Sequence, residues 1–318
     1  MAKHKRKNKH YLRTVFIISV ICALACLITI NETLEHPFLP TWDQIGEAIG
    51  ITDTSVTLPE SELQVHMIDV GNADALLIRN KDKNMLIDAG ENSDGDDVVD
   101  YLKKQGVKKL DLVIATHPDA DHIGGMDTVV DNLDIGTFIL AYMPKGYTPT
   151  TKTYESMLTS LLNKDIKITP AKVGEQYMLG DAKIDILGPV GDYTQTNNQS
   201  VVCKLTFGKN KFLFTGDAEE EAEEAILRSG VDLKADVLKV GHHGSGSSTD
   251  KKFLAAVRPR YALIPCGKDN SYNHPSPATL QRLQSANAAI YRADLNGTVV
   301  VTSNGTDISV KPEKASVS

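Results

Sequence analysis

The stretch 110–125 reads LDLVIATHPDADHIGG and decides the fold. Its first seven residues, LDLVIAT, form a mostly apolar run with the length of a buried strand. Two histidines and two aspartates follow within six residues, and Gly124-Gly125 then lets the backbone pass close to its surroundings. Because polar side chains at strand ends build the sites of α/β proteins, the stretch predicts a strand, a functional turn and a helix at 122–133.

The four polar residues of this turn are His117, Asp119, Asp121 and His122. Imidazole and carboxylate groups together suit zinc, manganese or iron, and two neighbouring ions need bridging oxygen ligands. One histidine beside one aspartate is usually a solvent-exposed pair without a functional role, whereas four such residues directly after a strand indicate a metal site. A thiolate zinc site is not expected, because the four cysteines form no CxxC motif.

Strands and helices alternate on both sides of this turn. Apolar or alternating runs predict strands at 63–69 and 211–215, and acidic first turns predict helices at 94–105 and 219–229. Strand meanders mixed with strand–helix units are typical of an α/β body with two mixed sheets and helices outside.

The turn resembles the HxHxDH signature of the metallo-β-lactamase superfamily, with Asp119 in place of the second histidine. With LIDAG at 86–90, this variant is similar to the ComEC-type branch, the metallo-β-lactamase-like domain of competence DNA-uptake proteins and their stand-alone relatives. Further motifs of that branch follow in order: NNQS at 197–200, FTGD at 214–217, HHGS at 242–245 and NHPS at 273–276. The resemblance implies a four-layer αββα fold with two mixed sheets.

The same resemblance implies two divalent metal ions, zinc or manganese. His117 and Asp119 would hold the first ion, and Asp121 and His122 the second. Asp217 would bridge both ions. One of the paired histidines would complete the second site, and His242 is preferred over its neighbour.

Other residues of the motifs take catalytic or substrate-binding roles under this resemblance. The catalytic set comprises Asp121 and two candidate proton donors, His243 and His274. For His274, a positioning role and metal ligation are the alternatives. Asn198, Ser200 and Ser245 would contact the substrate, the two serines through an anionic group. The superfamily's usual third histidine of the first site is not evident, and Asn198 stands in that region. Asp69, the last residue of the strand expected at 63–69, is expected to order the site through hydrogen bonds.

Composition and charge exclude several classes of protein. The 318 residues are 41% hydrophobic and 24% charged, which excludes a disordered chain and a polytopic membrane protein. Residues 1–13 carry six Lys or Arg and no acid, so the remaining 28 basic and 41 acidic residues leave the body at −13. Such a body does not bind nucleic acid through general electrostatic attraction. A phosphate substrate would need metal ions or a local basic patch.

The N-terminal sequence predicts a membrane-targeting segment that also anchors the protein. Residues 14–31 are almost entirely apolar and match the length of one membrane-spanning helix. The basic tail at 1–13 would stay in the cytoplasm, which places the body outside. A cleaved signal peptide and lipidation at Cys26 are the alternatives. Residues 32–60 read as a linker and 61–318 as the hydrolase domain, without the many spans of a DNA channel.

The function expected from the sequence is a membrane-anchored, extracytoplasmic hydrolase of phosphate esters. Two divalent ions would activate water for attack on phosphorus. Phosphodiester hydrolysis is expected first, with DNA implied by the resemblance. A teichoic-acid or choline-phosphate ester of the cell surface fits the same metal pattern, and a non-catalytic surface assembly component is the rival class. The sequence indicates no protein partner.

Overall fold

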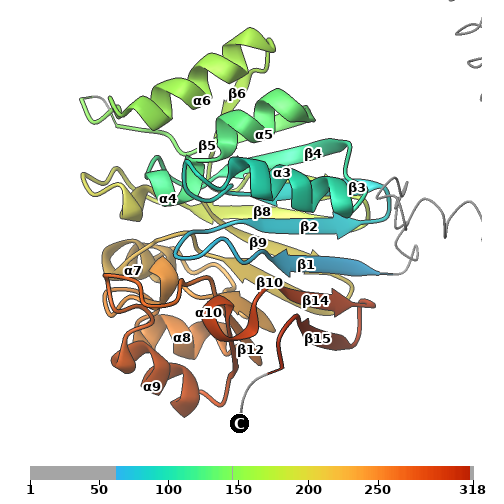
Figure 1. The fold of residues 1–318 in the computed structure, drawn as a ribbon. Coiled ribbons are helices and arrows are strands. Elements are labelled where there is room, and N and C mark those ends of the chain that lie inside the picture. Colours follow the sequence, from blue (N-terminus) through green and yellow to red (C-terminus); the bar gives the residue numbers. More distant parts are fainter. Residues whose placement is uncertain (1–61, 145, 316–318) are drawn as a thin grey trace, which may run out of the picture. The chain divides into compact units, whose positions relative to one another are not determined.

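The computed structural model describes residues 62–144 and 146–315, and these residues form two stacked sheets with helices outside (Figure 1). The first sheet has the order β15 (Ile308–Pro312), β14 (Val299–Ser303), β1 (Leu63–Met67), β2 (Leu76–Asn80), β3 (Lys83–Ile87), β4 (Lys109–Ala115), β5 (Asp134–Leu140) and β6 (Ile168–Pro170). The second has the order β13 (Ala289–Arg292), β12 (Tyr261–Ile264), β11 (Val237–Lys239), β10 (Asn210–Phe214), β9 (Val202–Phe207), β8 (Ala182–Gly188) and β7 (Gln176–Leu179).

The helices divide between the outer faces of the two sheets. The first sheet is covered by α3 (Gly95–Lys104), α4 (Ala120–Ile123), α5 (Met126–Asn132) and α6 (Lys152–Asn163). The second is covered by α7 (Glu220–Arg228), α8 (Lys251–Val257) and α9 (Pro277–Ser285). Short turns of helix are α10 (Ala293–Asn296), η1 (Asn197–Gln199) and η2 (His242–Gly244).

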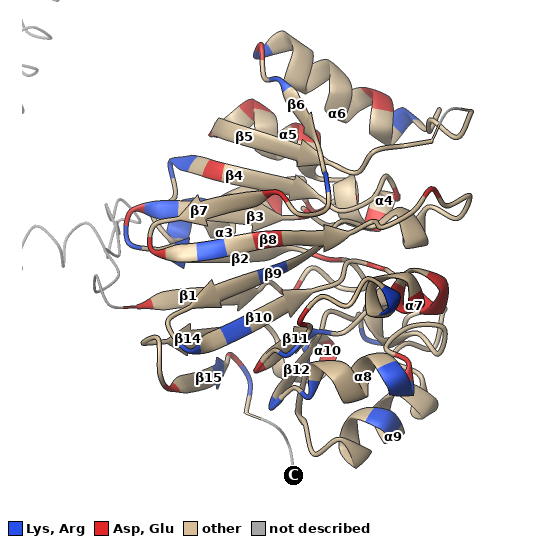
Figure 2. Cartoon of the chain, turned by 180° about the vertical axis from the view of Figure 1, so that it is seen from behind, with Lys and Arg blue, Asp and Glu red and all other residues tan. Residues whose placement is uncertain are grey.

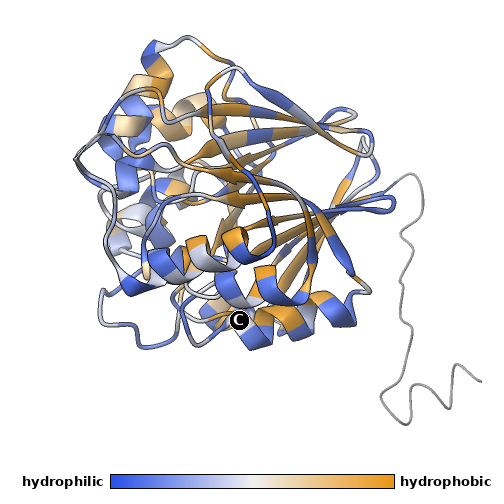
Figure 3. Ribbon diagram, turned by 90° about the horizontal axis from the view of Figure 1, so that it is seen from above, coloured by the Kyte–Doolittle hydropathy of each residue, from blue (hydrophilic) through white to orange (hydrophobic). Residues whose placement is uncertain are grey.

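Buried apolar side chains fill three layers. In β3, Met85 and Ile87 face the core between the sheets, while Leu86 packs under the helices. In β10, Phe212 likewise lies between the sheets and Leu213 faces the outer helices. Both faces of these strands are therefore buried, which explains their continuous apolar runs and the hydrophobic colour of the strands in Figure 3. The expected α/β architecture with two mixed sheets is confirmed.

Each sheet combines an antiparallel part with a parallel part. Strands β3 to β6 are parallel neighbours in the first sheet, and β10 to β13 are parallel neighbours in the second. Parallel strands end at the same edge of a sheet, so the segments after β3, β4, β10 and β11 can bring their side chains together there.

The helix expected at 122–133 is broken in two. Helix α4 ends at Ile123 and α5 begins at Met126, so Gly124-Gly125 separates them. A Cβ atom at Gly124 would clash with the backbone of Glu91 and Asn92. The prediction of one helix was wrong because the glycines serve this close approach of two chain segments.

The expected tail at 1–13, anchor at 14–31 and linker at 32–60 lie outside the described residues. Within 62–144 and 146–315, none of the helices combines the length and the apolar character needed to cross a bilayer.

Candidate metal centre

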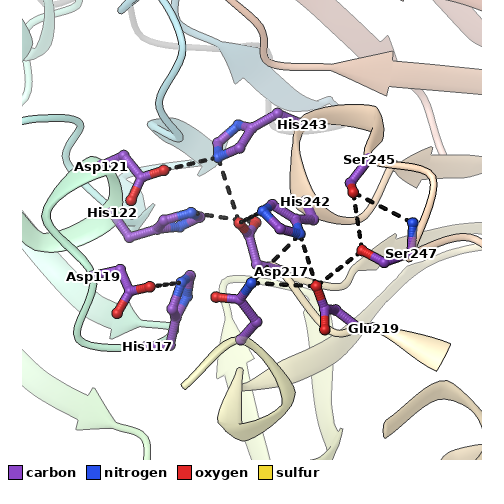
Figure 4. Close-up of polar contacts among 12 residues, drawn as sticks. His117, Asp119, Asp121, His122, Asp217, Glu219, His242, His243, Ser245 and Ser247 are labelled. Carbon is purple, nitrogen blue, oxygen red and sulfur yellow. Dashed lines mark hydrogen bonds and ion pairs between the residues drawn. The ribbon is translucent and has the colours of Figure 1, made fainter. Parts of the chain in front are cut away.

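The site residues come from the carboxyl ends of parallel strands in both sheets (Figure 4). His117, Asp119, Asp121 and His122 follow β4. Asp217 follows β10, while His242 and His243 follow β11. The structure therefore brings together all six expected metal ligands, although they are spread over residues 117–242 of the sequence.

The two ring nitrogens of His122 each contact a different carboxylate. Its Nδ1 lies 2.7 Å from Oδ2 of Asp88, and its Nε2 lies 3.2 Å from Oδ1 of Asp217. A carboxylate at Nδ1 fixes the hydrogen on that nitrogen and leaves Nε2 free to bind a metal ion. Asp88 also accepts hydrogen bonds from the backbone N–H and the hydroxyl of Thr116, which fixes its orientation.

His117 has the same tautomer for a different reason. The hydroxyl of Thr116 donates its only hydrogen to Oδ2 of Asp88 at 2.6 Å. Toward His117 the hydroxyl oxygen can therefore only accept, and it accepts a hydrogen bond from Nδ1 of His117 at 3.1 Å. Nε2 of His117 is then unprotonated, and it is buried without a hydrogen-bond partner. Burial lowers the pKa of His117 to about 3, so the ring is neutral, as a metal ligand must be.

His243 is the third imidazole of the cluster. Its Nδ1 donates to the backbone carbonyl of Pro265 at 2.9 Å, so Nε2 faces Asp121 at 3.2 Å and Asp217 at 3.5 Å. Burial lowers the pKa of this ring, but Asp217 and the neighbouring carboxylates outweigh burial and raise it to about 9. The carboxylates thus favour a cation at this position, which a bound metal ion would supply.

The donor set fits a divalent metal ion. His122, Asp217 and His243 each offer a ligand atom, and these atoms and an oxygen of Asp74 lie within 4.8 Å of one another. Buried imidazole nitrogens without a partner and converging carboxylates are what zinc, manganese or iron require. The arrangement supports a metal-binding cluster and does not select one metal.

Asp119 lies at the solvent side of the cluster. Its Oδ2 accepts a hydrogen bond from the Thr196 hydroxyl at 3.2 Å and lies 3.8 Å from Nε2 of His117. The side chain is 42% exposed, and burial of the rest raises its pKa. Asp119 and His117 therefore face each other, as expected for ligands of a first ion, but with few other partners nearby.

His242 differs from His243 in its surroundings. It is 24% exposed, and its Nδ1 lies 3.1 Å from Oε1 of Glu219. Its Nε2 lies 3.7 Å from Oδ2 of Asp217. Ser247 donates to the same oxygen of Glu219 at 2.9 Å, and Ser245 pairs with Ser247 at 2.9 Å. Glu219 therefore orients His242 at the edge of the cluster, as Figure 4 shows.

A pocket of about 180 Å³ opens over the cluster. Its lining comprises Asn72, Asp119, Asp121, Asn197, Asp217, His242, His243, Tyr272 and His274. A neighbouring cleft of about 580 Å³ shares Asn72, Asp119, Asp121 and Tyr272 with it and adds Glu91. No Lys or Arg lines either cavity in the described part of the chain, and Figure 2 shows acidic residues on α7 and near α4 at this edge.

His274 lies beside His242 in this pocket. Their ring centroids are 5.4 Å apart, and Tyr272 stacks on His274 at 5.8 Å. Burial, followed by the two neighbouring histidines, lowers the pKa of His274. Its Nδ1 is buried without a hydrogen-bond partner, so this nitrogen is available to a ligand.

The expected substrate contacts have different surroundings. Asn198 is buried, and its side-chain oxygen accepts from the backbone N–H groups of Glu219 and Ala222 at the start of α7. Ser200 is buried as well; its hydroxyl accepts from the N–H of Asp217 and lies 3.3 Å from Nδ1 of His117. Both residues hold the site together from inside and do not face the pocket.

Asp69, expected to order the site, is exposed and lies 3.6 Å from Lys314.

Four residues near the cluster were missed or given no role by the sequence reasoning: Asp74, Asp88, Glu219 and Lys239. For Asp74 and Lys239, the available signal was a charged residue among apolar neighbours, as in Ala73-Asp74-Ala75 and Val237-Leu238-Lys239-Val240. Such a residue is buried with its neighbours and needs an internal partner.

Comparison with known proteins agrees with this geometry. Residues 68–268 match the family described as the metallo-beta-lactamase superfamily. The chain belongs to this superfamily. A variant of the CmlA β-hydroxylase is similar in structure, with a TM-score of 0.50 and 13% identity over 76% of this chain and 54% of that one, which shows the fold alone.

The relatives of this superfamily member include competence proteins. ComE operon protein 3 of Bacillus subtilis is 33% identical over an alignment of 258 residues that covers 75% of this chain and 33% of that protein. Competence protein ComA of Neisseria gonorrhoeae is 29% identical over 88% of this chain and 38% of its own length. Recombination protein 2 of Haemophilus influenzae is 31% identical over 75% and 28%. The chain thus spans about a third of these relatives' length, and its resemblance to ComEC-type domains is confirmed.

Proposed function

We propose that this chain is a membrane-anchored, extracytoplasmic, binuclear metal-dependent phosphodiesterase that acts on DNA. One observation carries the proposal: the Nε2 atoms of His122 and His243, fixed from behind, converge on the carboxylates of Asp217 and Asp121 beneath an open pocket. Kinship with proteins named for competence and recombination favours DNA over a surface polymer.

The residues would divide into two ligand groups around Asp217. His117 and Asp119 would hold one ion, and Asp121, His122 and His243 the other. When bound, the ions would polarise a phosphoryl oxygen and supply a nucleophilic water near neutral pH. The acidic cleft repels a phosphate until these cations are present, because no basic side chain lines it among the described residues.

We assign the two adjacent histidines opposite roles to those expected from the sequence. His243 uses Nδ1 on Pro265 and presents Nε2 to Asp121 and Asp217, which suits a ligand. His242 is partly exposed in the pocket, and Glu219 orients it. A carboxylate-oriented imidazole at the substrate face is suited to give a proton to the leaving oxygen.

The reaction class is tested with purified full-length chain loaded with manganese or zinc. Substrates are single-stranded DNA, bis-p-nitrophenyl phosphate, p-nitrophenyl phosphorylcholine and nitrocefin. Cleavage of the first two supports the proposal. Cleavage of the choline ester alone would move the function to a surface esterase, and no cleavage of any phosphodiester would favour the assembly-component reading.

The donor role is tested with His242→Ala. The variant is expected to keep its metal and lose about 10²–10⁴-fold in rate on DNA. The loss should be smaller on bis-p-nitrophenyl phosphate, whose leaving group needs no proton. Loss of metal from His242→Ala would instead make His242 a ligand.

A further inference from the structure

Lys239 is a fully buried cation directly behind the metal cluster. It ends β11 in the middle of the second sheet, and only 1% of its side chain is exposed. Its Nζ lies 2.5 Å from Oδ2 of Asp74, 2.8 Å from the carbonyl oxygen of Gly216 and 3.4 Å from Oδ1 of Asp217. Lysine is almost never buried to this extent unless it is paired.

Asp74 lies on the rear side of the imidazoles. Its oxygens approach Nδ1 of His243 at 3.3 Å and Nδ1 of His122 at 3.9 Å. Nδ1 of His243 already donates to the carbonyl of Pro265, and Nδ1 of His122 already contacts Asp88. The Nε2 atoms of the two rings point the other way, toward Asp121 and Asp217. An ion bound by both Nε2 atoms therefore lies on the far side of the rings from Asp74.

The charge balance explains why Lys239 is retained there. Without it, Asp74 would be a buried carboxylate whose oxygens make no hydrogen bond. The Nζ atom of Lys239 faces the carboxylates of both Asp74 and Asp217, and two adjacent carboxylates favour the charged form of a lysine. The ammonium group is therefore charged and stays between the two aspartates.

We propose that Lys239 is a built-in cation of the metal centre: it occupies the place between Asp74 and Asp217 that a metal ion would otherwise take, and it keeps Asp74 out of the ligand set. Lys239 is thus a positioning residue, which confines bound ions to the Nε2 side of Asp217. The inference rests on the metal-dependent function proposed above.

Metal binding tests this inference without any measurement of hydrolysis. Manganese affinity and stoichiometry are measured by titration calorimetry and elemental analysis on full-length chain. Asp74→Asn leaves the ammonium unbalanced and should weaken manganese binding about 10–100-fold. Lys239→Met frees Asp74 and should tighten binding about tenfold. The double variant removes the ion pair as a unit and should bind within about threefold of wild type.

The double variant decides between the two roles of Asp74. If it binds manganese as weakly as Asp74→Asn, Asp74 is a ligand and the inference is wrong. Lys204→Met removes another buried lysine, on β9, and should leave manganese affinity unchanged. Weaker binding by Lys239→Met would also overturn the inference.

A direct readout on the wild-type chain covers the case in which a single variant does not fold. Anomalous scattering from manganese-soaked crystals should place ions next to Asp217 and the histidine Nε2 atoms. An ion within bonding distance of an Asp74 oxygen overturns the inference and leaves the proposed function intact. A chain that binds no manganese or zinc overturns both.

Discussion

Glu223 makes the stability of this protein depend on pH near neutrality. The side chain belongs to α7 and is 1% exposed. Its two oxygens accept hydrogen bonds from the backbone N–H groups of Thr249 at 2.6 Å and Asp250 at 2.8 Å. Thr249 in turn accepts from the N–H of Gly241, which precedes His242. Glu223 thereby anchors the segment that carries the paired histidines.

Burial is the largest influence on Glu223 and raises its pKa from 4.5 to about 7, against the two N–H donors, which lower it. A raised pKa means that folding favours the protonated group. The contribution to stability is therefore complete below pH 4.5 and is lost as the pH rises through about 7. At about 1.4 kcal/mol per pKa unit, the loss is about 3 kcal/mol.

The test compares Glu223→Gln with wild type in urea unfolding from about pH 5 to about pH 8. Because glutamine does not titrate, the free energy of unfolding of the variant should rise relative to wild type by up to about 3 kcal/mol over this range. Glu224→Gln removes one negative charge from the more exposed face of the same helix and should keep the wild-type slope. Parallel curves for wild type and Glu223→Gln would refute the reasoning.

Three further outcomes are expected. Asp217→Asn should lose bound metal and the proposed phosphodiesterase activity together, by elemental analysis and bis-p-nitrophenyl phosphate hydrolysis; retained metal would contradict the bridging role proposed for Asp217. Phe212→Ala, in the core between the sheets, should lower the free energy of unfolding by about 3–5 kcal/mol, and a loss below about 1 kcal/mol would contradict tight packing there. Protease added to intact cells should digest the body and leave the N-terminal stub; a body protected until lysis would reverse the proposed topology.

The strand and turn at 110–125 could be predicted because their signals are local. An apolar run of strand length and four ligand-type side chains stand together in the sequence, and β4 and the cluster after it match that pattern. The short edge strands β6 and β7 were missed because three or four partly exposed residues carry no apolar run. The break at Gly124 was missed because its cause lies in residues 91 and 92, which only the tertiary fold brings near.

The pairing of Asp74 with Lys239 shows the same limit at the site itself. Each residue stands among apolar neighbours and signals burial, but 164 intervening residues hide the partner. A buried charge needs compensation, so the physical rule predicts that some partner exists. Only the tertiary fold, which brings the two sheets together at this edge, identifies Lys239 as the partner of Asp74.

The two adjacent histidines cannot be distinguished by any sequence pattern, because each is an imidazole in the same motif. Their backbone decides: His242 and His243 both have φ of 49°, a left-handed conformation that costs energy for residues other than glycine. This turn sends one ring into the core, where the carbonyl of Pro265 fixes its hydrogen, and leaves the other at the pocket beside Glu219. Since hydrogen-bond partners and exposure distinguish the two side chains, the difference between the two histidines is a property of the fold and not of the motif.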